Sequence, residues 1–399
     1  MATTQKAPFT YPLSLAKRFV HLFERTKPPV NEQQALLAAA YYTLSVDESA
    51  SHNQSNIHIN SAIALLKKIP RPLRKNNWNS QIAHAYFKRA ELLEDKAAFG
   101  SAIYDYQQVM IAFEANRQDY LNDKDKLILA QSAISIADLL VTDQSKENSS
   151  VSHPLFYINK GLEYLANVTE TDQETWATHA YAHRIAGVIL SIGNFAEAKE
   201  AFRVALLMAF KSDNSRVCPL LADLYSLLGL LYEQNYEACP IQKDAVSLLD
   251  HARIYFELSL LFTPCPEEED DNETDYVLGV ESLFELIYRV LDPSLSELTY
   301  QPTSDLIDAL IYAFVCVIDK VLPNKNLEQQ LDHPDVLDTY AQHVHWLLIE
   351  AYRRKHIDEY FIQIMDFKPV KFEVNPEQVF FLMQNQGVRE NVYYLPTFR

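Results

Sequence analysis

The chain has 399 residues, of which 48% are apolar and 22% charged, with only 7 glycines against 18 prolines. This length accommodates about two or three ordinary domains and a continuous hydrophobic core. So few glycines argue against an all-β fold, because tight hairpin turns need residues that tolerate positive φ. The formal net charge of −18 repels phosphate backbones, so we expect no nucleic-acid partner.

The N-terminal segment, residues 1–29, is basic, with five Lys and Arg side chains against Glu24 alone. Residues 13–23 place large apolar side chains on one helical face and basic side chains off it. This pattern is typical of a mitochondrial presequence, but also of an N-terminal helix that packs on the next element. We therefore expect residues 1–30 to be an amphipathic helix and lead-in, with mitochondrial import through residues 1–29 as the alternative.

The placement of the four cysteines bears on the compartment in which the protein is expected. They are scattered along the chain with no metal-ligand spacing, a pattern that fits reduced, mostly buried thiols in a cytosolic protein. The N-terminus lacks the layout of a secretory signal, and the longest uncharged apolar stretch is about half of what a bilayer requires. We expect a cytoplasmic protein without a transmembrane segment.

Apolar residues recur at helical spacing along almost the whole chain, and no stretch alternates with period two. Proline and N-cap residues punctuate the pattern where helices should begin or end. The predicted helices are 31–45, 57–69, 80–95, 99–115, 124–141, 154–167, 173–191, 195–210, 219–234, 242–263, 274–291, 303–322, 333–354, 356–365 and 376–385. Long polar loops are expected at 46–56 and 142–153.

Small and aromatic residues recur in a fixed order across three segments. Segment 225–232 reads Tyr-x-x-Leu-Gly-x-x-Tyr, and Ala252, Phe256 and Pro264 follow it. The matching residues elsewhere are Tyr86, Ala90, Leu93, Phe99, Ala102, Tyr106 and Val109, and then Gly193, Phe195, Ala198, Phe202 and Ala205. Small residues allow two helices to cross closely, while large ones fill the gap to a neighbour. Such pairs bury their apolar faces only by stacking.

On these residues, segment 80–264 resembles the tetratricopeptide repeat family, whose unit is a helix–turn–helix of about 34 residues. The resemblance implies an all-α, right-handed superhelical solenoid of antiparallel helix pairs. The signature fades after residue 275, where we expect a divergent all-α C-terminal region. The unit that begins at Tyr225 is longer than the family pattern, and we interpret residues 233–245 as an insertion.

The expected domains follow from these patterns. They are the lead-in 1–30, TPR-like helical repeats at 31–264, an acidic linker at 265–275 and a C-terminal helical region at 276–399 that ends in an aromatic tail. Residues 267–275 hold seven acids in nine positions, which predicts a solvated segment. The tail 392–399 either packs on the last helices or docks on a partner.

The family resemblance also implies a binding site, because the first helix of each pair lines a concave groove where peptides or helices dock. The positions carried over are His84, Phe87, Lys88, Glu91, His183, Arg184, Gly187, Asp223, Ser226, Leu227 and Leu230. Lys88 and Arg184 would favour an amphipathic segment with an acidic flank. Several of these side chains would alternatively pack between repeats.

The sequence contains no motif that identifies an enzyme. It has no GxGxxG, no GxxxxGK[ST] and no GxSxG. His179 and His183 share a helical face but lack a third ligand, so we expect no metal site and no cofactor.

The predicted function is a non-enzymatic scaffold or adaptor that binds a protein or peptide segment. The alternative is an all-α enzyme or secreted bacterial effector whose pocket is formed by residues 233–245 and the C-terminal helices. Nothing in the sequence fixes the oligomeric state.

Overall fold

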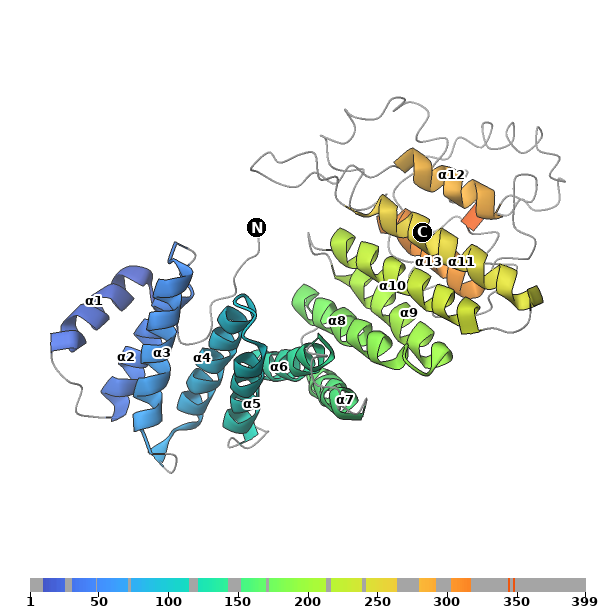
Figure 1. Ribbon diagram of the computed structural model, residues 1–399. Coiled ribbons are helices and arrows are strands. Elements are labelled where there is room, and N and C mark those ends of the chain that lie inside the picture. Colours follow the sequence, from blue (N-terminus) through green and yellow to red (C-terminus); the bar gives the residue numbers. More distant parts are fainter. Residues whose placement is uncertain are drawn as a thin grey trace. The chain divides into compact units, whose positions relative to one another are not determined.

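The computed structural model describes residues 10–25, 31–47, 49–70, 73–114, 121–142, 152–169, 172–212, 217–238, 242–263, 280–291 and 303–316, together with Val344, Leu347 and Leu348 (Figure 1). All regular elements in these ranges are helices, so the predicted all-α class is confirmed. The helices are α1 Leu13–Arg25, α2 Asn31–Ser45, α3 His52–Lys68, α4 Asn76–Glu94, α5 Phe99–Glu114, α6 Asp123–Thr142, α7 Ser152–Ala166, α8 Gln173–Leu190, α9 Phe195–Lys211, α10 Val217–Ala238, α11 Gln242–Leu261, α12 Val280–Leu291 and α13 Ser304–Cys316.

The chain forms two compact units, residues 1–214 and 215–399. The first unit contains α1 to α9 and the second α10 to α13. Their boundary falls inside the segment 31–264 that the sequence predicts as one run of repeats. The predicted linker 265–275, the aromatic tail 392–399 and the helices predicted at 356–365 and 376–385 lie outside the described residues, as does nearly all of the helix predicted at 333–354.

The predicted helices from 31–45 to 242–263 are found at nearby boundaries, and the differences concern helix ends. Helices α12 and α13 lie within those predicted at 274–291 and at 303–322, whose start and end respectively fall outside the described residues. Ser51 caps α3 by accepting a hydrogen bond from the backbone N–H of Gln54, whose side chain bonds back to the Ser51 backbone. This capping box starts the helix at His52, so the loop predicted at 46–56 is too long. Likewise α7 starts at Ser152, inside the loop predicted at 142–153. Residues 233–238 are the end of α10 and 242–245 the start of α11.

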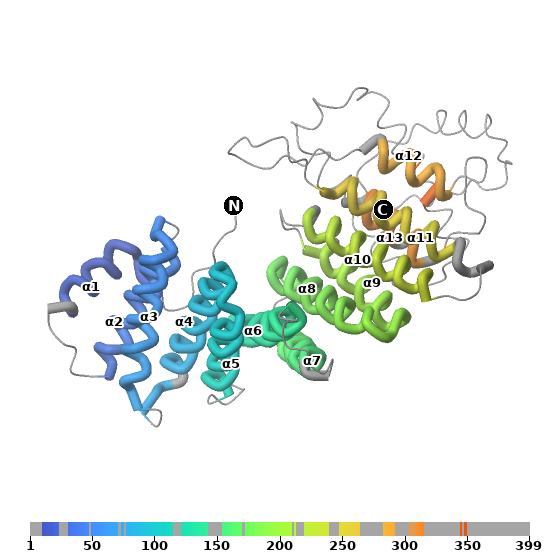
Figure 2. Tube along the Cα trace, viewed as in Figure 1, coloured from blue at the N-terminus to red at the C-terminus, as the bar shows by residue number. Residues whose placement is uncertain are grey.

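In the first unit each helix packs on the next one along the chain, and the closest contacts join α2 to α3, α4 to α5, α6 to α7 and α8 to α9 (Figure 2). Further contacts join α2 to α4, α4 to α6 and α6 to α8. The even-numbered helices therefore form one connected layer, on which the odd-numbered partners pack. In the second unit α10 packs on α11, α11 on α12 and α12 on α13.

Glycines lie where paired helices come closest. A Cβ atom on Gly187 of α8 would lie 2.5 Å from the Phe202 ring of α9, and one on Gly229 of α10 would lie 2.7 Å from the Phe256 ring of α11. Both distances are too short for a side chain, so glycine is what allows each phenylalanine to sit against the facing helix. The predicted role of Gly229 at a helix crossing is thus confirmed.

The first prediction tests this close packing. Gly187→Ala should lower the free energy of unfolding by about 1–3 kcal/mol, because Phe202 is buried and its ring must move to admit the methyl group. Denaturant titration measures the change. Gly100→Ala in α5 is the matched control, since nothing lies within 4 Å of its added methyl. This variant should gain up to about 1 kcal/mol from helix propensity. Equal effects of the two substitutions would contradict the packing interpretation.

No helix in the described ranges is both long and apolar enough to cross a membrane.

Candidate binding groove of the first unit

One cavity of the first unit is an open groove of about 760 Å³. Its walls come from the C-terminal end of α2, the N-terminal end of α3, one face of α4, and the N-terminal parts of α6 and α8. Residues that precede and begin α1 close one side. The groove therefore follows the layer of even-numbered helices.

The α4 wall includes His84, Phe87, Lys88 and Glu91. Their spacing of three and four residues places them on one helical face. The Lys88 Nζ lies 3.0 Å from a Glu91 carboxylate oxygen, and both side chains are partly exposed. Phe87 packs edge-to-face on Tyr106 of α5, with ring centroids 5.6 Å apart. This wall therefore combines a fixed apolar surface with a neutralised ion pair.

A buried polar cluster joins α4 to α6, and its His84 is also part of the groove lining. The Ser80 hydroxyl donates to the Oδ1 atom of Asp125 over 2.7 Å, and the His84 Nε2 atom lies 3.0 Å from the same oxygen. The side chains of His84 and Asp125 are only 4% and 5% exposed. Because buried polar groups are costly without partners, these bonds fix how α4 and α6 are placed against each other.

The opposite face of α4 is held by Arg89. Its guanidinium donates to both carboxylate oxygens of Asp105 in α5, over 2.6 and 2.7 Å, and to Asn60 of α3 over 2.8 Å. The Asp105 side chain is only 1% exposed. A two-point bond of this kind fixes orientation as well as distance. Neighbouring helices thus hold α4 from both sides.

The walls from α6 and α8 carry several carboxylates. Asp123 accepts from Lys126 and from the backbone of Thr169, each over 3.0 Å. Asp172 caps α8 by accepting from the backbone N–H of Thr175 over 2.9 Å. Glu174 accepts a 3.3 Å hydrogen bond from Gln131 of α6. The last two bonds come from neutral donors, so among the described residues neither Asp172 nor Glu174 forms an ion pair.

The segment before α1 is also part of this site. The Tyr11 backbone N–H donates to the Thr43 hydroxyl of α2 over 3.1 Å, and the Tyr11 ring lies 5.6 Å from that of Phe19. Partial burial raises the pKa of Tyr11. Helix α1 buries Ala16 and Val20 in a cluster with residues of α2, as expected of an N-terminal helix that packs on its neighbour.

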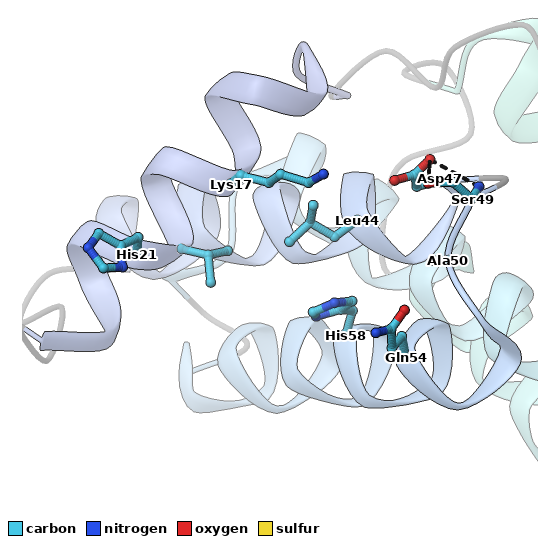
Figure 3. Close-up of a pocket in the computed structure, with 9 residues that line it drawn as sticks. Lys17, His21, Leu44, Asp47, Ser49, Ala50, Gln54 and His58 are labelled. Atoms are coloured by element: carbon cyan, nitrogen blue, oxygen red, sulfur yellow. Dashed lines mark hydrogen bonds between the residues drawn. The ribbon is translucent and has the colours of Figure 1, made fainter.

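A smaller cavity of about 410 Å³ lies between α1, the end of α2 and α3 (Figure 3). Lys17 and His21 reach it from α1, and Gln54 and His58 from α3. The Asp47 carboxylate at its edge accepts hydrogen bonds from the backbone and hydroxyl of Ser49. With few apolar walls and no buried charge aimed into it, this cavity is a weaker candidate site than the groove.

The structure brings together only part of the predicted site. His84, Phe87, Lys88 and Glu91 line the groove. His183, Arg184 and Gly187 of α8 do not: Gly187 faces Phe202, and Arg184 lies 5.7 Å from the Tyr181 ring centroid. The remaining predicted residues belong to α10 in the second unit: Asp223, Ser226, Leu227 and Leu230, of which Leu230 is exposed.

Sequence reasoning missed the contribution of α6. Lys124, Leu127, Ile128 and Gln131 line the groove with the same spacing as the four α4 residues, 40 positions further along the chain. This repeated spacing was the available signal. It was hidden because the residues at these positions differ in type from those of α4 in all four cases.

The histidine pair of α8, His179 and His183, lies in surroundings that lower the pKa of both side chains. The pKa of His179 is lowered by burial and then by the positive charge of Lys211, which also disfavours a bound cation. Burial and then His179 lower the pKa of His183 to about 4. Within the described ranges, no group of three His, Cys, Asp or Glu residues is placed to hold a metal ion.

Comparison with protein-family models gives no match to this chain, and neither does comparison with curated proteins.

The second prediction concerns the cluster at Asp125. Asp125→Ala leaves the buried Ser80 and His84 side chains without their shared acceptor, so the free energy of unfolding should fall by about 2–4 kcal/mol. Urea titration measures this loss. As the control, Asp95→Ala removes an exposed carboxylate that is 3.9 Å from His52 and should change stability by no more than about 0.5 kcal/mol. A loss at Asp125 no larger than the control would refute the proposed role.

The third prediction concerns pH. His183 has a pKa of about 4 in the folded chain against about 6.5 when unfolded. Between these values the unfolded chain binds the extra proton, so the free energy of unfolding falls as the pH falls. Denaturant titrations at pH 7.5 and 4.5 measure how much unfolding free energy is lost on acidification. This loss should be smaller in His183→Gln than in the wild type, by on the order of 1–3 kcal/mol. The same substitution at His21, an exposed side chain of α1, is the matched control, and an effect of equal size there would contradict the assignment to His183.

Proposed function

We propose that the chain is a non-enzymatic scaffold or adaptor that binds a protein or peptide segment in the groove of its first unit. The observation that carries this proposal is the joint lining of the 760 Å³ groove by α2, α4, α6 and α8. A surface shared by successive helices offers an extended series of contacts, which suits a chain segment.

The proposal includes a TPR-like, right-handed solenoid of antiparallel helix pairs. Two features support it: the contacts among even-numbered helices, and the glycine-to-phenylalanine contact that occurs in both the α8–α9 and the α10–α11 pair. In such an array, the first helices of the pairs form the inner layer and their partners the outer one. The groove lies along the layer that this arrangement makes concave.

The polar cluster in the groove has a structural rather than a catalytic arrangement. The Ser80 hydroxyl donates to Asp125 and His84 contacts that same carboxylate. Nucleophilic catalysis needs the histidine in contact with the hydroxyl instead. This supports a binding protein over an enzyme. The scattered cysteines support a cytoplasmic setting as part of the same proposal.

The fourth prediction tests the groove with a bulky side chain. Lys124 is an exposed residue in the first turn of α6 and lines the groove. Lys124→Trp should block part of the binding surface, so quantitative affinity capture from native lysate should recover some partners at least about fivefold less. Far-ultraviolet circular dichroism should show unchanged helicity.

The matched control is Lys68→Trp, which makes the same substitution at an exposed lysine in the last turn of α3, outside the groove lining. This variant should capture the wild-type set of partners. If the two variants recover identical sets at equal yield, the groove is not the binding site.

A further inference from the structure

The charges that line the groove are unequal. Five carboxylates face two lysines, an excess of three negative charges when the histidines are neutral. The residues concerned are Asp47, Glu91, Asp123, Asp172 and Glu174, with Lys88 and Lys124. This excess sets the sign of the potential that an approaching ligand meets, and low-dielectric walls concentrate it.

Two of the five carboxylates already have cationic neighbours. Glu91 pairs with Lys88 at 3.0 Å, and Asp123 pairs with Lys126 at the same distance. Each pair is formed inside one helix between residues three apart, so it forms without any ligand. These four charges cancel locally and contribute little to recognition at a distance.

The other three carboxylates receive hydrogen bonds only from neutral groups among the described residues. Asp47 accepts from Ser49, Asp172 from Thr175, and Glu174 from Gln131. They lie at separate positions along the groove: Asp47 just after α2, and Asp172 and Glu174 at the start of α8. Lys124 is the one lysine in the lining that has no ion pair among the described residues.

Between these acidic ends lies an apolar strip. Phe87 of α4 and Ile128 of α6 are partly exposed members of the groove lining that also pack against the main core cluster of α2–α6. Leu127 lies beside them and is 7% exposed. Rigid, partly exposed apolar side chains of this kind suit the apolar face of an amphipathic segment.

We propose that the occupant of the groove is a basic amphipathic segment of a partner protein. Its apolar side chains pack on Phe87 and Ile128, while its Lys or Arg side chains pair with Glu174 and Asp172 at one end and with Asp47 at the other. This inference rests on the proposed function and gives the partner a chemical class. It reverses the acidic flank expected from the sequence, because Glu91 already pairs with Lys88 and Arg184 lies outside the groove lining.

The test uses two synthetic probes of about 18 residues, both with leucines at helical spacing. One carries lysines at all other positions and the second carries glutamates. Fluorescence anisotropy with the full chain should give an affinity for the lysine peptide at least about tenfold higher, and this difference should shrink as salt rises from about 0.05 to 0.5 M. Equal affinities for the two probes would overturn the proposal.

Because the whole chain is acidic, it would attract any cationic peptide weakly. Variants therefore test whether the preference for the lysine peptide arises at the groove. Asp47→Asn combined with Glu174→Gln keeps the size of both side chains and removes two charges. The double variant should lower the affinity for the lysine peptide about five- to tenfold. Glu197→Gln is the matched control, because Glu197 is the first-turn glutamate of α9 as Glu174 is of α8. It should change the affinity by less than about twofold, and an equal loss in the control would overturn the proposal.

Other outcomes separate this inference from the proposed function. If Lys124→Trp loses partners but the double variant binds the lysine peptide as the wild type does, the groove remains a binding site and its acidic selectivity is wrong. If the peptide binds only after residues 1–9 are deleted, that segment is the occupant instead. If the double variant dissociates a homodimer seen by analytical ultracentrifugation, the occupant is a second copy. Either of these last two results overturns the proposal that the occupant is a segment of a partner protein.

Discussion

The groove depends on the contact between α4 and α6, and a shared buried carboxylate holds that contact together. Asp125 of α6 accepts from Ser80 and contacts His84, two residues one turn apart on α4. A hydrophobic contact between two helices tolerates small sliding or rotation, because apolar attraction has no direction. Two polar contacts to one oxygen do not tolerate it, because a displaced buried group would lose its partner. The register of α4 on α6 is therefore set by polar contacts within an apolar core.

The same helix, α4, is fixed from its other side by Arg89 and Asp105. One interaction joins α4 to α6 in the even-numbered layer, and the other joins α4 to its partner α5. As a result, His84, Phe87, Lys88 and Glu91 are presented on a surface with little freedom to move. A preorganised surface loses less entropy when it binds a ligand. His84 takes part in both arrangements, because it contacts Asp125 and also lines the groove.

Much of the fold could be predicted from the sequence, because helical periodicity and small residues at helix crossings are local signals. Gly229 illustrates this: its spacing to Phe256 indicated a close crossing, and the structure places the ring against it. The lining of the groove was harder to predict from the sequence. Gly187 occupies an expected groove position, yet its missing side chain serves the contact with Phe202. Sequence alone does not say which face of a helix meets its partner, and in α6 the repeated spacing was hidden because the residues at 124–131 differ from those of α4.

The charge of the groove shows the same difficulty in a sharper form. From the sequence, Lys88 is a cation on an exposed helical face, and an acidic ligand is the natural expectation. In the structure Glu91, three residues later, neutralises it, whereas Glu174 is turned toward Gln131 of α6 and retains its charge. What a ligand meets is the set of charges left after intramolecular pairing. Pairing within a helix can be recognised from sequence spacing, but pairing between helices can be recognised only from the fold. The sign of the net charge that lines the groove therefore follows only when sequence and fold are considered together.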